Sequence, residues 1–206
     1  MSALPRVALL NPPGRELYIR DYYCSKVSKT GYLYHPTDLL TASGVLDGAA
    51  EMRVLDAIAE RLSVEESLRR LEAFAPDVVL MLSGAVSFHE DRDFAQALQK
   101  RRPCRILVSG DLFMEDGAGL LAEHPWMDAI LTDFTTPALV DYVQGKEGPL
   151  PGFLHRGLRE VRVGPHPPGP ELAERVPRLG QLEVRVLPRG RLAGGGPDLG
   201  LRRRRG

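Results

Sequence analysis

The chain has few cysteines and no long apolar run, and both absences exclude whole classes of protein. Its 206 residues include only two cysteines, Cys24 and Cys104, so we expect neither a disulfide framework nor a zinc site of four Cys or His ligands. The apolar run near the amino terminus is too short for a signal peptide, and no segment reaches membrane-spanning length. The sequence therefore predicts a cytoplasmic protein with no membrane partner.

The chain also has no excess of charge of either sign. Lys and Arg together number 27, as do Asp and Glu, which argues against nucleic-acid binding because that function requires a basic surface. Residues 165–206 are the exception, being rich in Pro and Gly and ending in the run GLRRRRG. No folded or aromatic segment accompanies this run, so we expect a mostly disordered tail and no nucleic-acid partner.

The common nucleotide-binding motifs are missing as well. No G-x-G-x-x-G follows the first predicted strand, and no G-x-x-x-x-G-K-[ST] occurs, which disfavours dinucleotide and P-loop nucleotide binding. A phosphoacceptor receiver domain would need an aspartate after the third strand and acids after the first, where this chain has Ser83 and Asn11. A flavodoxin-like or receiver-like regulatory domain, binding a partner or a smaller cofactor, is one alternative function, and a degenerate fragment that binds nothing is the other.

What the chain does contain is a regular alternation of strands and helices. Residues 75–111 are organised around a strand, a helix and a second strand, and the first strand, at 77–82, is apolar without alternation. Such a strand is buried on both faces, as in a parallel sheet covered by helices. With further strands expected at 6–10, 51–56, 105–108 and 128–131, the sequence predicts an α/β domain with a doubly wound, five-stranded parallel sheet of flavodoxin-like or Rossmann-like type.

The same pattern sets the expected domain organisation. Residues 1–145 are predicted to form the α/β domain, 146–164 a small extension with a hairpin at 153–163, and 165–206 the tail. Residues 15–36 have no strong period and contain five of the six tyrosines. We expect that segment to be a lid or a domain contact, because long irregular segments in compact domains are often functional.

Small, hydroxyl-bearing or polar residues follow four of the predicted strands. In an open α/β sheet the carboxyl ends of the strands form the edge where ligands bind, so the sequence predicts a site for a large polar ligand there. The strand-end segments are Asn11-Pro12-Pro13, Ser83-Gly84, Ser109-Gly110-Asp111 and Asp133-Phe134-Thr135-Thr136.

Candidate catalytic residues are sparse. The run His89-Glu90-Asp91 could be an acid/base or metal cluster, but acids are also favoured in the first turn of a helix, and we adopt that interpretation. Cys24 has basic neighbours, yet the sequence identifies no partnering base. We therefore assign no catalytic residue and no metal ligand.

The order and spacing of these motifs resemble the amino-terminal cobalamin-binding domain of cobalamin-dependent radical SAM proteins. The resemblance covers about residues 5–163. It rests on VALLNPP at 7–13, HPTDLLTASGVL at 35–46, RVLDA at 53–57, PDVV at 76–79, ILVSGD at 106–111 and DAIL at 128–131.

The resemblance implies a cobalamin-binding module in which the corrinoid lies across the carboxyl ends of the strands. The chain lacks the Cys-x3-Cys-x2-Cys triad that holds a [4Fe–4S] cluster in that family, so we expect no cluster, no S-adenosylmethionine site and no methyltransferase activity from this chain alone. The implied partner is a radical SAM domain or protein, with the tail marking a truncation or a shifted reading frame. The D-x-H-x-x-G motif is also missing, so no cobalt ligand is named. The resemblance places around the cofactor Asn11, Pro12, Ser83, Gly84, Ser109, Gly110, Asp111, Asp133 and Thr135.

Overall fold

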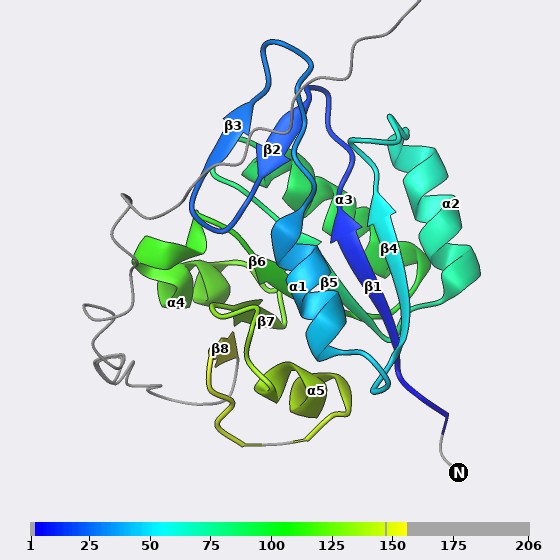
Figure 1. Ribbon diagram of the computed structural model, residues 1–206, viewed down its shortest axis with the longest axis vertical. Helices are drawn as coiled ribbons and strands as arrows, with labels where there is room; N and C mark the ends of the chain where they lie inside the picture. The colour runs from blue at the N-terminus through cyan, green and yellow to red at the C-terminus, as the bar shows by residue number, and fades with distance from the viewer. Residues whose placement is uncertain (1–2, 147, 156–206) are drawn as a thin grey trace, which may run out of the picture. The chain divides into compact units, whose positions relative to one another are not determined.

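The computed structural model describes residues 3–146 and 148–155, and these form an α/β domain with a six-stranded, mostly parallel sheet (Figure 1). The strand order is β4-β1-β5-β6-β7-β8, and the first five strands of that order run parallel. The strands are β1 (Arg6–Asn11), β4 (Glu51–Asp56), β5 (Val78–Leu82), β6 (Arg105–Ser109), β7 (Ala129–Leu131) and β8 (Phe153–His155). All five predicted parallel strands are thus confirmed to within one residue at either end.

The predicted count of five strands is wrong, because β8 adds an antiparallel sixth strand to the sheet. Leu131 of β7 is paired with Phe153 of β8, and the buried Phe153 ring stacks on Tyr142 at 5.1 Å between centroids. The connection from β7 to β8 contains α5, so no tight turn sets the antiparallel direction, and the pairing depends on contacts made in the folded domain. The rest of the hairpin predicted at 153–163, like the tail at 165–206, lies outside the described residues.

Helices cover both faces of the sheet. One face packs against α1 (Thr37–Val45) and α5 (Ala138–Val143), and the other against α2 (Val64–Phe74), α3 (Phe88–Arg101) and α4 (Phe113–Glu123). Side chains alternate along each strand, so Leu9 and Leu10 of β1 enter different cores. Each face of the sheet therefore has its own hydrophobic core. None of the described helices is long and apolar enough to cross a membrane.

A local sequence signal explains where α2 starts. Ser63 caps α2 by accepting a hydrogen bond from the Glu66 N–H at 3.1 Å, as expected for a serine just before a helix. Helix α4 begins at Phe113 and has a kink at Asp116, whereas the sequence pattern at 117–124 by itself indicates a start at Gly117. The buried Phe113 side chain belongs to the core, and this packing favours the earlier start.

A separate two-stranded antiparallel sheet forms within the tyrosine-rich segment. It consists of β2 (Tyr18–Arg20) and β3 (Ser25–Val27), which we call the edge hairpin, residues 18–27. In Figure 1 the edge hairpin lies beyond the arrowheads of β1 and β4. The sequence predicts an irregular segment here, because strands of three residues are too short to establish a period.

Candidate functional site at the carboxyl edge of the sheet

The five parallel strands end at one edge of the sheet, and the chain changes winding direction there. Strand β1 lies between β4 and β5, so the crossover from β1 leads to one side and the return to β5 leads to the other. Sheets of this strand order bind ligands where the direction reverses, outside the carboxyl ends of the strands. In this domain that point lies between Asn11 and Ser83.

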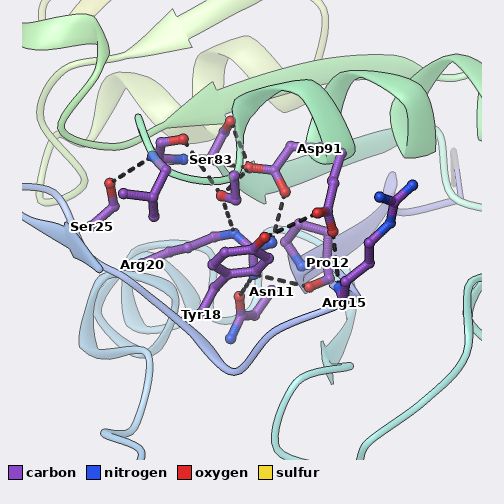
Figure 2. Close-up of polar contacts among 12 residues, drawn as sticks. Asn11, Pro12, Arg15, Tyr18, Arg20, Ser25, Ser83 and Asp91 are labelled. Carbon is purple, nitrogen blue, oxygen red and sulfur yellow. Dashed lines mark hydrogen bonds and ion pairs between the residues drawn. The ribbon is translucent and has the colours of Figure 1, made fainter. Parts of the chain in front are cut away.

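The buried Arg20 side chain fastens the edge hairpin to this point (Figure 2). Its Nη2 contacts Asp91 Oδ1 at 2.7 Å, and both side chains are 0% exposed. Its Nε donates to Ser87 Oγ at 2.9 Å, and its Nη1 donates to Asn11 Oδ1 and to the Pro12 carbonyl, both at 3.0 Å. One guanidinium therefore joins the hairpin to the end of β1 and to α3.

Asp91 is the main hydrogen-bond acceptor in the cluster around Arg20. Its Oδ2 accepts hydrogen bonds from Ser83 Oγ at 2.9 Å and Ser87 Oγ at 2.7 Å. Burial raises the pKa of Asp91, while the Arg20 guanidinium and the two hydroxyls act in the opposite direction. The short contact to the guanidinium is a charge-assisted hydrogen bond, which is among the stronger polar contacts in proteins.

A second attachment holds the hairpin over the ends of β5 and β6. The Ser25 N–H donates to Asp111 Oδ2 at 2.6 Å, and the Ala85 N–H donates to Asp111 Oδ1 at 3.1 Å. Gly84 lies directly beneath Ser25, whose side chain would collide with any Cβ at position 84. The glycine therefore permits close packing of the hairpin on the sheet edge.

The structure brings the predicted site residues to one edge but gives most of them a partner within the chain. Asn11 binds Arg20 and also donates to Asp56 Oδ1 at 2.9 Å, and Ser83 binds Asp91. Gly110 has a φ of +152°, and a Cβ there would collide with the Ser83 carbonyl oxygen. These residues shape the edge, whatever ligand it takes.

The end of β7 is more open. Asp133 Oδ1 accepts hydrogen bonds from the N–H and the hydroxyl of the exposed Thr135, at 2.9 and 2.6 Å. Between them in sequence, the Phe134 ring lies 5.7 Å from the ring of Tyr22 in the edge hairpin. The hairpin thus spans the edge from β1 to the end of β7.

Ser109 is a predicted site residue whose hydroxyl forms no hydrogen bond with the described residues. It is buried. Side-chain alternation puts it on the same face of the sheet as Asn11, toward α1. A buried hydroxyl without a partner costs about 1–3 kcal/mol, so Ser109 is a candidate contact for a ligand.

A cavity of about 330 Å³ opens beside the hairpin at the ends of β1 and β4. We call it the edge pocket. Its volume is at the low end of the roughly 300–1,000 Å³ typical of small-molecule sites. The residues that line it include Asn11, Tyr18, Asp21, Lys26, Leu33, Tyr34, His35, Thr37, Asp56 and Ile58.

Sequence reasoning missed Arg20 and Asp91, the two residues that organise this edge. The predicted polar first turn of α3 is correct for Glu90, which accepts a hydrogen bond from the Tyr18 hydroxyl at 3.0 Å. Asp91, however, lies on the same helix face as the buried Phe88 and Ala95. An acid on an apolar helix stripe is the signal that could have predicted a buried basic partner.

Asp38 links the hairpin to the start of α1. Its Oδ2 accepts a hydrogen bond from the Tyr22 N–H at 2.7 Å, and burial raises the pKa of this carboxyl. A raised pKa means that the folded state binds the proton more tightly than the unfolded state does. The ionised Asp38 therefore lowers stability progressively as the pH rises from below the ordinary value, near 3.9, through the folded-state pKa.

We predict that Asp38→Asn raises the melting temperature at pH 7, because asparagine keeps an oxygen for the Tyr22 N–H and removes the buried charge. The gain should disappear when thermal unfolding is measured below about pH 3.9, where Asp38 is protonated in both states. Asp93→Asn, at an exposed carboxylate of α3, is the matched control. A lower melting temperature for Asp38→Asn at pH 7 would contradict the assignment.

Comparison with known proteins adds no family: no family model matches the chain, and no curated protein matches it.

Proposed function

We propose that this domain binds a corrinoid, cobalamin in the first instance, at the carboxyl edge of its sheet. The observation that carries the proposal is the strand order β4-β1-β5-β6-β7, which collects the Asn-Pro-Pro and Ser-Gly turns at one ligand-binding edge. At the same edge, the buried Ser109 hydroxyl has no partner among the described residues. A ligand with many amide groups on its periphery, as a corrinoid has, could supply that partner.

Polar groups that such a ligand could use lie at the end of the edge formed by β6 and β7. Asp133 and Thr135, which are not buried, would hold the cofactor with the hairpin in place, and the buried Ser109 would meet it after a local opening of the edge. Gly84 and Asp111 lie under Ser25, so they would contact a corrinoid only after the hairpin moves. The other predicted site residues, Asn11, Pro12, Ser83 and Gly110, would act by shaping the edge and anchoring the hairpin.

In this proposal the chain is a carrier rather than a complete enzyme. A bound corrinoid would supply the group-transfer chemistry of its cobalt centre, and the residues of the chain would bind and orient it. The proposed partner is a radical SAM domain or protein. Tyr23 and Tyr32, both strongly exposed in the tyrosine-rich segment, are the side chains that we propose to meet it.

Two observations favour a second candidate, a flavodoxin-like domain with a smaller cofactor. The strand order is also that of flavodoxin-type sheets, and the edge pocket of about 330 Å³ suits a ligand much smaller than a corrinoid. This candidate predicts that flavin mononucleotide binds and that hydroxocobalamin does not.

Titrating the full chain with hydroxocobalamin, and separately with flavin mononucleotide, tests both candidates by visible absorbance. We expect saturable corrinoid binding that Ser109→Ala weakens several-fold, because the variant loses one hydrogen bond worth about 0.5–1.5 kcal/mol. Thermal stability should not fall in this variant, since the hydroxyl has no described partner. Ser43→Ala, which removes an exposed hydroxyl of α1, is the control. Flavin binding without corrinoid binding would overturn the proposal in favour of the second candidate.

A further inference from the structure

The edge pocket has a floor of polar groups and walls of mixed character. Asn11 and Asp56, at the carboxyl ends of β1 and β4, form part of the floor. The edge hairpin contributes one wall, and residues 33–37, leading into α1, contribute another. This pocket lies on the β1 and β4 side of the edge, whereas Asp133 and Thr135 lie at the end of β7.

Asp56 has a carboxylate oxygen to offer a ligand. Both hydrogen bonds that the described residues make with this carboxylate end on Oδ1, from Asn11 Nδ2 at 2.9 Å and from the Ala59 N–H at 3.0 Å. These bonds hold the side chain in place and leave Oδ2 as an acceptor. In doubly wound sheets, an acid that ends the strand following β1 in sequence and beside it in space binds ribose hydroxyls, and Asp56 ends the corresponding strand here.

Other residues of the lining suit an aromatic base. Tyr34 is held by an edge-to-face contact with Tyr32, at 5.0 Å between centroids, and Leu33 and Ile58 add apolar surface. Aromatic and apolar side chains bind bases by stacking, with little dependence on base identity.

The charge of the lining does not favour a phosphate. Arg20 is paired with Asp91, and Lys26 Nζ lies over the Tyr34 ring at 5.5 Å from its centroid. Two carboxylates, Asp21 and Asp56, line the same cavity and would repel an anion. The ligand that fits is uncharged, with hydroxyls at one end and a flat ring at the other.

We infer that the edge pocket binds a ribonucleoside group, with its ribose hydroxyls on Asp56 Oδ2 and its base against Tyr34. The ligand we propose is a free nucleoside, because the nucleotide end of a corrinoid carries a phosphodiester that Asp21 and Asp56 would repel. This site therefore does not rest on the function proposed above. The free nucleoside would make this pocket a second site, next to the proposed corrinoid site.

Titration of the full chain with adenosine and with 2′-deoxyadenosine, followed by ligand-observed NMR, tests whether the edge pocket binds a free nucleoside. A parallel titration with cobalamin and with cobinamide, which lacks the nucleotide, measures whether a phosphate-bearing nucleotide binds in the same pocket. Adenosine should bind about tenfold or more tightly than 2′-deoxyadenosine, because a hydrogen bond to a charged group is lost in the latter. Asp56→Asn should remove this difference without lowering the melting temperature, since its Oδ1 can still accept from Asn11 and Ala59. Asp93→Asn should leave the difference unchanged.

The outcomes separate the two proposals. Adenosine binding with the expected discrimination, and no corrinoid binding, supports the nucleoside site and overturns the corrinoid function. Cobalamin binding at least tenfold tighter than cobinamide, lost in Asp56→Asn, would show that the pocket takes a phosphate-bearing nucleotide and would overturn the inference of an uncharged ligand. Equal binding of cobalamin and cobinamide, with no adenosine binding, overturns the nucleoside site alone. Adenosine binding that is indifferent to the 2′-hydroxyl and to Asp56→Asn also overturns it.

Discussion

Replacing Arg20 by methionine should lower the free energy of unfolding by about 3–5 kcal/mol, because removing one partner of a buried ion pair leaves the other charge uncompensated. Asp91 is fully buried and takes its 2.7 Å contact from this guanidinium. The variant also loses the hydrogen bonds to Ser87, Asn11 and Pro12. Urea-induced unfolding of both proteins measures the difference.

The double variant Arg20→Met/Asp91→Leu is the matched test of the physical cause. Replacing both members of a buried pair by apolar residues is often neutral or stabilising, so the double variant should recover much of the stability that Arg20→Met loses. Arg92→Ala, which breaks a solvent-exposed pair with Asp93, should change stability little. A loss below about 1 kcal/mol for Arg20→Met would show that the cluster does not anchor the hairpin.

Gly110→Ala should be the most damaging single-methyl substitution at the sheet edge, with an expected loss of at least about 2 kcal/mol. Its φ of +152° disfavours a side chain, and the added Cβ would meet the carbonyl oxygen of Ser83, a backbone atom that cannot rotate away. The ends of β5 and β6 would have to separate. Corrinoid binding should therefore weaken in the same variant.

Gly44→Ala is the control for this prediction. Gly44 lies in α1 with open space around the position of a Cβ, and alanine is favoured over glycine in a helix by about 0.5–1 kcal/mol. The control should thus raise the unfolding free energy while Gly110→Ala lowers it. Equal effects of the two substitutions in chemical denaturation would contradict the tight approach of β5 and β6 at Gly110.

The sequence predicted the parts of the fold that depend on neighbours along the chain. The apolar runs at 77–82 and 105–108 indicated strands buried on both faces, and Ser63 indicated the start of α2; the structure has β5, β6 and the Ser63 cap at these places. Continuous apolar character and capping are local properties, so a single sequence carries them.

The parts that were missed depend on contacts between distant residues. The edge hairpin is too short to show a period, and Arg20 and Asp91 are 71 positions apart, so neither side chain shows locally that it is buried. The sequence likewise predicted β8 as part of a separate hairpin. Its pairing with β7 depends on contacts between residues that are distant in the sequence. Strand-end residues were predicted to share an edge, which they do, but their partners within the chain, such as Ser25 on Asp111, could not be predicted.

Co-elution of the full chain with hydroxocobalamin on a desalting column tests whether the carboxyl edge of the sheet holds a corrinoid. We expect the protein fraction to keep the visible spectrum of the corrinoid at close to one equivalent, and Gly110→Ala to retain less. A protein fraction without corrinoid absorbance, collected from wild-type protein that unfolds cooperatively, would contradict the claim that this sheet edge is a corrinoid site.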